Sequence, residues 1–223
     1  MRISRKTKRA ASRLIVIVCV LLTACVVAGT ALDTMIEVPD VTMLRGADGQ
    51  TLIVRITSRK APAYGLPKTA EYQDTFAARL DQMAEIFAFS RIQVEINARG
   101  GLVRAARGIA QALAARREYK HFVIDGLCGS SMIQILALGK PDFVSMTDSS
   151  SIILHEKRNA YTMTKTGNDQ DEIAGIARLT GQDMETVKLW FLGSGNNEWT
   201  QFNRKQASAL GFLGAKTWQE VQP

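Results

Sequence analysis

The chain has 223 residues, enough for one globular domain plus an extension, and its apolar and charged contents are those of an ordinary folded protein. Its formal net charge is +7, which would suit a nucleic-acid partner if the cations lay on the folded part. However, six of the 28 Lys and Arg residues precede the first acidic residue, Asp33. Removing six from 28 leaves 22 basic residues against 21 acidic ones. No basic surface for phosphates remains, so the sequence predicts no nucleic-acid partner.

The N-terminal segment predicts a contact with a membrane. Behind those six cations, the 19 residues from Leu14 to Leu32 carry no charge, which is just long enough for a helix to span a bilayer. A positive flank ahead of such a run keeps the N-terminus in the cytoplasm and exports the rest. The segment is expected to remain as a signal-anchor, to be cleaved after Ala31, or to be lipidated at Cys25. The folded part would then be anchored to the inner (cytoplasmic) membrane on the exported side, or released into the periplasm.

The residues after this segment divide into a linker with N-terminal β-structure over 33–68 and a main domain over 69–223. Alternating apolar residues predict a half-buried strand at 92–97, and helical spacing of apolar residues predicts a helix at 74–89. Further elements are expected as strands at 43–46, 51–56 and 119–125, and as helices after 102 and over 131–138. This alternation is typical of an α/β fold with a largely parallel sheet.

Two turns are predicted at the carboxyl ends of neighbouring strands, where open α/β sheets bind ligands. They are Asn97–Gly101 and Asp125–Ser130. In the second, a strand turns over small residues into a helix and places Ser130 at the positive end of the helix dipole. A hydroxyl there is suited to carry negative charge in a transition state, which indicates a serine hydrolase.

The cysteines give no sign of a metal centre. Cys19 and Cys25 lie in the apolar run, so Cys128 is alone in the folded part and has no partner there for a disulfide. No spacing typical of metal ligands is present. Cys128 is therefore expected to be a buried packing residue, and no metal is expected.

Several short motifs resemble the proteolytic subunit of Clp protease. Ile96–Gly101 is similar to its Ile-Asn-Ser-Pro-Gly-Gly turn, and Gly126–Ser130 is similar to its Gly-x-Ala-Ala-Ser, in which the serine is the nucleophile. Ile152–His155 resembles the strand that carries its catalytic histidine, with 25 residues from Ser130 to His155 as in the family. Thr180–Gln182 and 207–212 resemble its later segments, and the match covers roughly 74–214.

This resemblance implies a ClpP/crotonase-like fold, a spiral of ββα units, and a serine endopeptidase that needs no cofactor. Ser130 would be the nucleophile and His155, one of two histidines in the chain, its base. The N–H groups of Ser131 and Gly101 would bind the oxyanion, and Gly100 belongs to the same substrate-binding turn. The spacing to His155 favours Ser130 over the adjacent Ser131 as nucleophile.

The third member of the triad is not at its expected place. Counting back from Gly211 as in the family reaches Trp199, which is not an acid. Glu198 is the preferred candidate to orient the imidazole, with Asn197 or no third member as alternatives. In addition, Ala98 and Arg99 replace the serine and proline of the family's glycine turn.

Other functions remain open at this point. A Ser–Lys pair, as in signal peptide peptidases, would use Lys157 or Lys165, although both are expected to be solvated surface residues. A catalytically silent binding or scaffold protein would share the fold without the chemistry. Acyl-CoA chemistry also occurs on crotonase folds, but a Ser–His pair argues against it.

The segment 160–192 carries an apolar stripe of Ile173, Ile176 and Ala177, followed by Val187, Trp190 and Phe191. Such a stripe on a peripheral segment predicts a homo-oligomer. An exported domain cannot meet the cytosolic ATPase that feeds Clp protease. The expected function is therefore an ATP-independent peptidase that acts on peptides or proteins outside the cytoplasm.

Overall fold

The computed structural model describes residues 35–214 except 63–65, 159–164, 166–168 and 194–197. The predicted membrane segment, Cys25 and Asn197 lie outside these residues. Among the described helices, none combines the length and apolar character needed to cross a bilayer. One compact unit contains Ile36–Ala61 together with the chain from Leu66 onward, and the following description concerns that unit.

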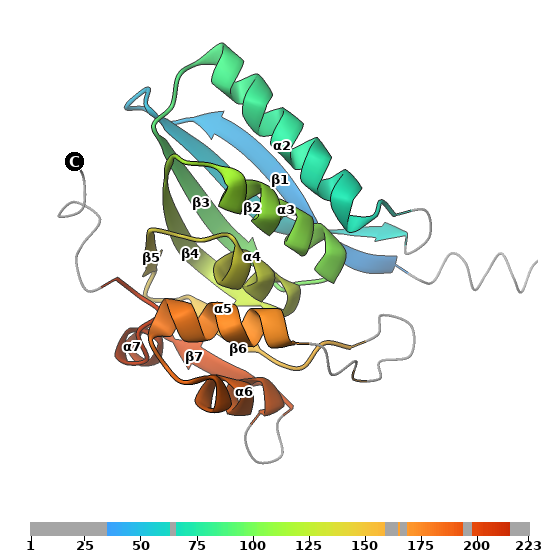
Figure 1. Cartoon of the computed structure of the whole chain (residues 1–223), viewed down its shortest axis with the longest axis vertical. Coiled ribbons are helices and arrows are strands. Elements are labelled where there is room, and N and C mark those ends of the chain that lie inside the picture. Colours follow the sequence, from blue (N-terminus) through green and yellow to red (C-terminus); the bar gives the residue numbers. More distant parts are fainter. Residues whose placement is uncertain (1–34, 63–65, 159–164, 166–168, 194–197, 215–223) are drawn as a thin grey trace, which may run out of the picture. The chain divides into compact units, whose positions relative to one another are not determined.

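The described strands form a seven-stranded sheet in the order β1-β2-β3-β4-β6-β7, with β5 paired to β4 (Figure 1). All pairings from β2 to β6 are parallel, and only β6 and β7 run antiparallel among the pairs with a described register. The predicted largely parallel sheet is confirmed. The strands are β1 (Met35–Arg45), β2 (Thr51–Pro62), β3 (Arg91–Ala98), β4 (Tyr119–Gly129), β5 (Phe143–Met146), β6 (Ser151–Leu154) and β7 (Thr200–Asn203).

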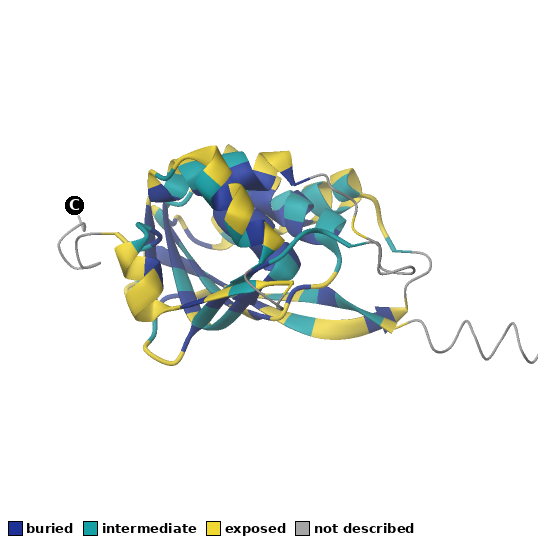
Figure 2. Cartoon of the chain, turned by 90° about the horizontal axis from the view of Figure 1, so that it is seen from below, coloured by how far each residue is buried: buried dark blue, intermediate teal, exposed yellow. Residues whose placement is uncertain are grey.

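Four helices lie side by side in chain order over one face of the sheet, with α2 next to α3, α3 next to α4, and α4 next to α5 (Figure 1). In α2, α3 and α5, buried residues alternate with exposed ones, whereas α4 has no exposed residue (Figure 2). The helical segments are α2 (Thr69–Ile86), α3 (Val103–Ala115), the short 3₁₀ helix η1 (Ser130–Met132), α4 (Ile133–Leu138), α5 (Gln170–Thr180), α6 (Met184–Leu192) and α7 (Arg204–Ala209).

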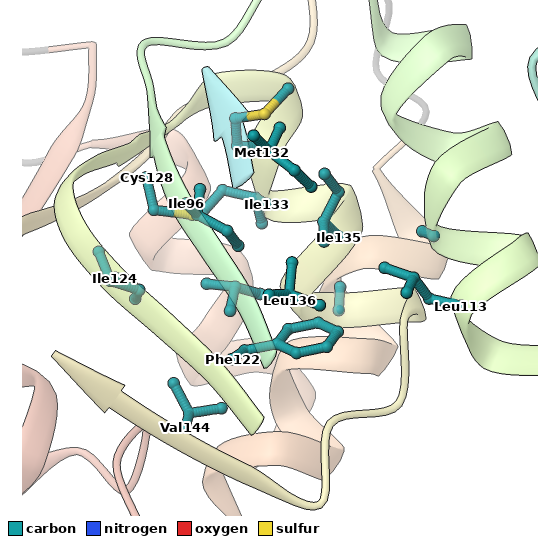
Figure 3. Close-up of a cluster of buried hydrophobic side chains, with 14 of the residues drawn as sticks. Ile96, Leu113, Phe122, Ile124, Cys128, Met132, Ile133, Ile135, Leu136 and Val144 are labelled. Atoms are coloured by element: carbon teal, nitrogen blue, oxygen red, sulfur yellow. The ribbon is translucent and has the colours of Figure 1, made fainter. Parts of the chain in front are cut away.

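The core lies between this helical layer and the sheet. On β3, Ile92, Val94 and Ile96 are fully buried, as the alternation in the sequence predicted. Around Phe122 of β4, apolar side chains of α4 complete the same buried cluster (Figure 3). Burial of each such side chain contributes about 1.5–3 kcal/mol, so β4 and the helix that follows it are firmly held in place.

The predicted peripheral apolar stripe is not a free surface. Ile173, Ile176, Val187 and Phe191 are buried in the core of the same chain. Trp190 is partly buried and packs edge-on against a phenylalanine of β7. The expectation that this stripe lies open for self-association is wrong, because α5 packs against α4 and α6, and α6 packs against β7. Other apolar side chains of α6 are exposed instead, namely Met184, Leu189 and Leu192.

Candidate functional site

A bend in β4 sets up the site. Gly126 has φ 123°, and a Cβ atom there would lie 2.4 Å from the side-chain oxygen of Asn97. That oxygen accepts a hydrogen bond from the Leu127 N–H at 3.2 Å. On the other side, the hydroxyl of Ser150 accepts from the Gly126 N–H at 2.7 Å and donates to the Ile124 carbonyl at 2.9 Å. These bonds satisfy the backbone where the ladder is interrupted, and they fix the bend.

The bend brings the candidate catalytic residues onto neighbouring strands. Before it, β4 pairs with β5, and after it β4 pairs with β6. Gly129 lies opposite Ile153, so Ser130 follows the carboxyl end of β4 beside the end of β6 that leads to His155. Ser130 and His155 both line one pocket of about 750 Å³.

Both adjacent serines line this pocket, and Ser130 is the more exposed of the two. It has φ 53°, a left-handed conformation that is uncommon for serine, and it is partly exposed. Ser131 is only 3% exposed, and its Oγ atom has no hydrogen-bond partner among the described residues. The strained turn from strand to helix therefore leaves Ser130 partly exposed and buries the hydroxyl of Ser131.

The glycine turn after β3 packs directly against Ser130. A Cβ atom on Gly100 would lie 2.5 Å from the Cβ and 3.1 Å from the Oγ of Ser130. Gly101 instead faces β1, because a Cβ there would lie 2.0 Å from the carbonyl oxygen of Glu37. The same oxygen accepts the N–H of Leu102 at 2.8 Å. Both glycines are thus required by close approach, Gly100 to the serine and Gly101 to the strand that borders the pocket.

The orientation of His155 is set by its own backbone neighbour. Its Nδ1 atom lies 2.7 Å from the carbonyl oxygen of Glu156. A carbonyl oxygen only accepts hydrogen bonds, so Nδ1 carries the proton of the neutral ring and Nε2 keeps a lone pair. Among the described residues, no hydrogen bond joins His155 to Ser130 or to Glu198. The ring is nevertheless in the tautomer that a general base requires.

Glu198 is bonded elsewhere. Its carboxylate forms an ion pair and hydrogen bond with Arg158 (which also lines the pocket). The hydrogen bond and the charge of Arg158 hold the pKa of the Glu198 carboxyl below its usual value, with a smaller contribution from His155. In the antiparallel pair of β6 and β7, Leu154 lies opposite Thr200, so the chain before Thr200 approaches His155 through Trp199. Glu198 lies two residues before Thr200 and is paired with Arg158.

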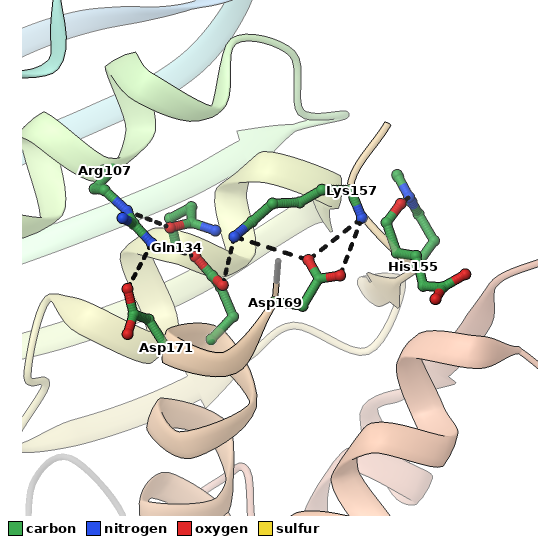
Figure 4. A network of polar contacts seen from close by, with 8 residues as sticks. Arg107, Gln134, His155, Lys157, Asp169 and Asp171 are labelled. Atoms are coloured by element: carbon green, nitrogen blue, oxygen red, sulfur yellow. Dashed lines mark hydrogen bonds and ion pairs between the residues drawn. The ribbon is translucent and has the colours of Figure 1, made fainter. Parts of the chain in front are cut away.

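A buried ion-pair network forms the pocket wall next to His155 (Figure 4). The ammonium of Lys157 lies 2.6 Å from Glu172 and 3.8 Å from Asp169. The backbone N–H of Lys157 also donates to the Asp169 carboxylate at 3.3 Å. The expectation that Lys157 is a solvated surface residue is wrong, since its side chain is 15% exposed and its charge is neutralised by buried carboxylates. Lys165 is more exposed and pairs with Glu156 at 2.5 Å.

The network continues across three helices. Arg107 of α3 contacts Glu172 at 3.1 Å and Asp171 at 2.8 Å, both on α5, and Gln134 of α4 at 3.4 Å. The Glu172 side chain is only 1% exposed, so it depends on Arg107 and Lys157 for charge compensation. Burial also raises the pKa of the Asp169 carboxyl, against the opposing charge of Lys157. This network was not predicted, because the partners of Arg107 and Lys157 are distant in the sequence.

The remaining candidates lie away from the pocket. His121 is near the start of β4, with Nε2 2.7 Å from the Ser145 hydroxyl and its ring against Phe143, and burial lowers its pKa from 6.5 to about 4. This histidine is therefore part of the packing at the far end of β4 and does not line the pocket. Cys128 is fully buried and its pKa is raised by burial, so its predicted role in packing is confirmed. Within the described residues, no group of three or more side chains is placed to hold a metal ion.

Comparison with solved structures relates the fold to a known class. A point mutant of ClpP1 from Listeria monocytogenes is similar with a TM-score of 0.54 and 16% sequence identity, over 74% of this chain and 90% of that chain. No family model matches the chain, and no curated protein matches it either. The chain therefore has a mixed α/β fold similar to that of ClpP.

Proposed function

We propose that the chain is a serine peptidase with Ser130 as nucleophile and His155 as general base. The observation that carries this proposal is the pairing of β4 with β6, which brings a strained, partly exposed serine and a correctly protonated imidazole to one pocket. A ClpP-like fold supports a peptidase at the level of class. The backbone of Gly100 packs against Ser130, and a close glycine backbone is typical of sites that catalyse acyl transfer.

In the proposed reaction, Nε2 of His155 takes the proton of the Ser130 hydroxyl while Oγ attacks the carbonyl carbon of a peptide bond. The C–N bond then breaks, and the imidazolium returns the proton to the departing amine. Water, deprotonated by the same nitrogen, releases the acid and restores the serine. The Glu156 carbonyl holds Nδ1–H throughout, in the position usually taken by an acid.

Two charges develop in this reaction, the negative charge of the oxyanion and the positive charge of the His155 imidazolium, and each needs a partner. We assign the oxyanion to the N–H of Ser131 and to the turn of Gly100 and Gly101, and loss of one such donor costs about 10²-fold or more in rate. Glu198 is assigned a supporting role. Its carboxylate and the imidazolium of His155 attract each other even while Arg158 holds the carboxylate.

The decisive experiment is labelling by a fluorophosphonate probe, which needs an activated serine. The full chain and Ser131→Ala are expected to be labelled, whereas Ser130→Ala and His155→Ala are not. Lys157→Met distinguishes a Ser–His mechanism from a Ser–Lys mechanism. We expect this variant to be labelled, because Lys157 is ion-paired with Glu172 and so is not the base. Labelling that survives Ser130→Ala would refute the assignment.

A catalytically silent binding protein is the second candidate. It is favoured by one observation, that the described residues contain no hydrogen bond between Ser130 and His155 and that Glu198 is engaged by Arg158. Catalytic hydrogen bonds are often made only when substrate is bound, so the geometry of the free chain suits both candidates. Absence of labelling in a folded, unmodified chain would decide for the silent protein.

The proposal includes the place of action and the assembly. The six N-terminal cations and the uncharged run 14–32 support a membrane-tethered, ATP-independent peptidase outside the cytoplasm. Recovery of the full-length chain in the cytosolic fraction would contradict this. A homo-oligomer is supported by the apolar side chains that α6 exposes, and a monomeric mass by light scattering would contradict it.

A further inference from the structure

The pocket contains one arginine whose charge has no carboxylate partner within the described residues. Four cations line it. Arg107 and Lys157 are paired with Glu172, and Arg158 with a glutamate of the loop before β7. Arg104, the second residue of α3, forms no ion pair with any carboxylate that the structure describes. Three carboxylates, those of Glu37, Asp169 and Glu172, also line the pocket. Arg104 is therefore the lining cation that no described carboxylate neutralises by an ion pair.

The hydrogen bonds of Arg104 are also incomplete. One terminal nitrogen donates to the carbonyl of Leu66 at 3.2 Å. Its Nε atom is buried and has no hydrogen-bond partner among the described residues. A guanidinium has five N–H donors in a planar fork, and a buried donor without an acceptor destabilises the fold. The side chain thus retains donors of the kind that bind a carboxylate in two-point fashion.

The rest of the pocket defines what accompanies that carboxylate. Apolar side chains line the same pocket as Arg104 and the serine. They come from the start of α3, from α4 and from α6, and are Leu102, Val103, Ile133 and Phe191. A fitting ligand therefore combines an apolar group with a negative charge.

We infer that Arg104 binds a carboxylate of the peptide substrate, while the apolar wall receives a neighbouring side chain. This inference rests on the proposed peptidase function, because Ser130 opens into the same pocket. The carboxylate is either the C-terminal group of the peptide or an Asp or Glu side chain. In the first case the enzyme trims peptide ends, and in the second it selects acidic sequences.

Binding to the full chain carrying Ser130→Ala tests this without turnover. Isothermal titration would use two pairs of N-acetylated peptides: Ala-Ala-Ala-Leu as acid and as amide, and the amides of Ala-Glu-Ala-Leu and Ala-Gln-Ala-Leu. A charge-assisted hydrogen bond contributes about 1.5–3 kcal/mol, so the charged member of one pair should bind about 10- to 100-fold more tightly. The pair that shows the preference identifies the source of the carboxylate.

Three further substitutions in that background show which residue is responsible. Arg104→Gln should abolish the preference and Arg104→Lys should keep part of it, since a lysine retains the charge without the fork. Arg178→Gln, at an exposed arginine of α5 outside the pocket, should leave it unchanged. Thermal unfolding of each variant verifies that the fold is retained.

The inference is overturned if no peptide binds, if both members of each pair bind equally, or if Arg104→Gln keeps the preference. Asp33 and Glu220 are the acidic residues outside the described part of the chain. If Asp33→Asn or Glu220→Gln destabilises the chain as much as Arg104→Gln does, Arg104 has a structural partner and the inference also fails. Failure of the peptidase function itself is seen separately, as absence of fluorophosphonate labelling.

Discussion

The two halves of the candidate site are held by different forces. Ser130 directly follows β4, whose bend is fixed by hydrogen bonds from its backbone to side-chain oxygens and whose sides are packed by buried apolar residues. His155 begins an irregular segment after a four-residue strand, and the side chains beside it are held by charges from α3 and α5. One half is fixed by shape, the other by electrostatic pairing.

This difference has consequences for how each half responds to change. Apolar packing and close backbone contacts tolerate little change in volume, because interiors are already at crystal-like density. A buried ion-pair network instead fails when one partner loses its charge, since the remaining charge is left without compensation. Substitutions that alter volume should therefore disrupt the serine half, and substitutions that alter only charge should disrupt the histidine half.

The largest effect is expected from Gly100→Ala. The new methyl would lie 2.5 Å from the Cβ of Ser130, at a residue with φ 122°. Backbone strain and overpacking each cost about 1–3 kcal/mol, so the free energy of unfolding should fall by about 3–5 kcal/mol. Urea unfolding measures the loss, and fluorophosphonate labelling should be lost at temperatures where the fold survives.

Gly181→Ala is the matched control for this substitution. Gly181 also has a positive φ, 71°, but a Cβ atom there meets nothing within 4 Å. Only the backbone term remains, about 1 kcal/mol, and labelling should persist. Equal losses of stability in the two alanine variants would show that contact with the serine is unimportant.

A smaller effect, confined to charge, is expected from Glu172→Gln. The side chain keeps its shape, but Arg107 and Lys157 lose the carboxylate that both contact. Loss of one partner of a buried pair costs about 3 kcal/mol, reduced here because Arg107 remains partly open to solvent. Labelling of Ser130 should slow, because Lys157 lies two residues after His155.

Asp171→Asn provides the comparison on the same arginine. The Asp171 side chain is 64% exposed, and an exposed pair contributes at most about 1 kcal/mol. Unfolding of both variants in parallel at constant ionic strength separates the two contributions. If Asp171→Asn were as damaging as Glu172→Gln, burial would not be what gives the network its strength.

The serine half was largely predictable from the sequence. Alternation marked β3, small residues marked the turn at Ser130, and these local signals do not depend on distant partners. The turn also explains why Ser130 and not Ser131 is the candidate nucleophile, because Ser131 is buried where the chain enters the helix. Which glycine contacts the serine could not be read, because both glycines look alike until β1 is placed against Gly101.

The histidine half was mostly hidden from sequence reasoning. Lys157 and Arg107 look like ordinary surface cations, and their shared partner Glu172 lies 15 and 65 residues away. The neighbouring residues in the sequence do not distinguish a solvated side-chain charge from one that is enclosed between helices. Likewise, the position of Glu198 depends on an antiparallel register and on Arg158, which no short motif specifies.

A third effect, smaller than those of Gly100→Ala and Glu172→Gln, concerns pH and the far end of β4. Burial depresses the pKa of His121 from 6.5 to about 4, so between these values the unfolded chain binds a proton that the folded chain does not. The stability that the neutral ring provides is fully present above pH 6.5 and is lost as the pH falls toward 4. At pH 5 the loss should be about 1–2 kcal/mol.

Urea unfolding of the unmodified chain and His121→Gln at pH 7.5 and pH 5 isolates this contribution. The glutamine does not titrate, so the difference in stability between the two proteins should shrink on acidification as the wild type loses its advantage. The same substitution at His155, the other histidine, gives the matched comparison. A difference at His121 that stays constant across this range would mean that the ring takes up its proton without leaving the core. In that case burial of His121 would not make the stability of the fold sensitive to acid.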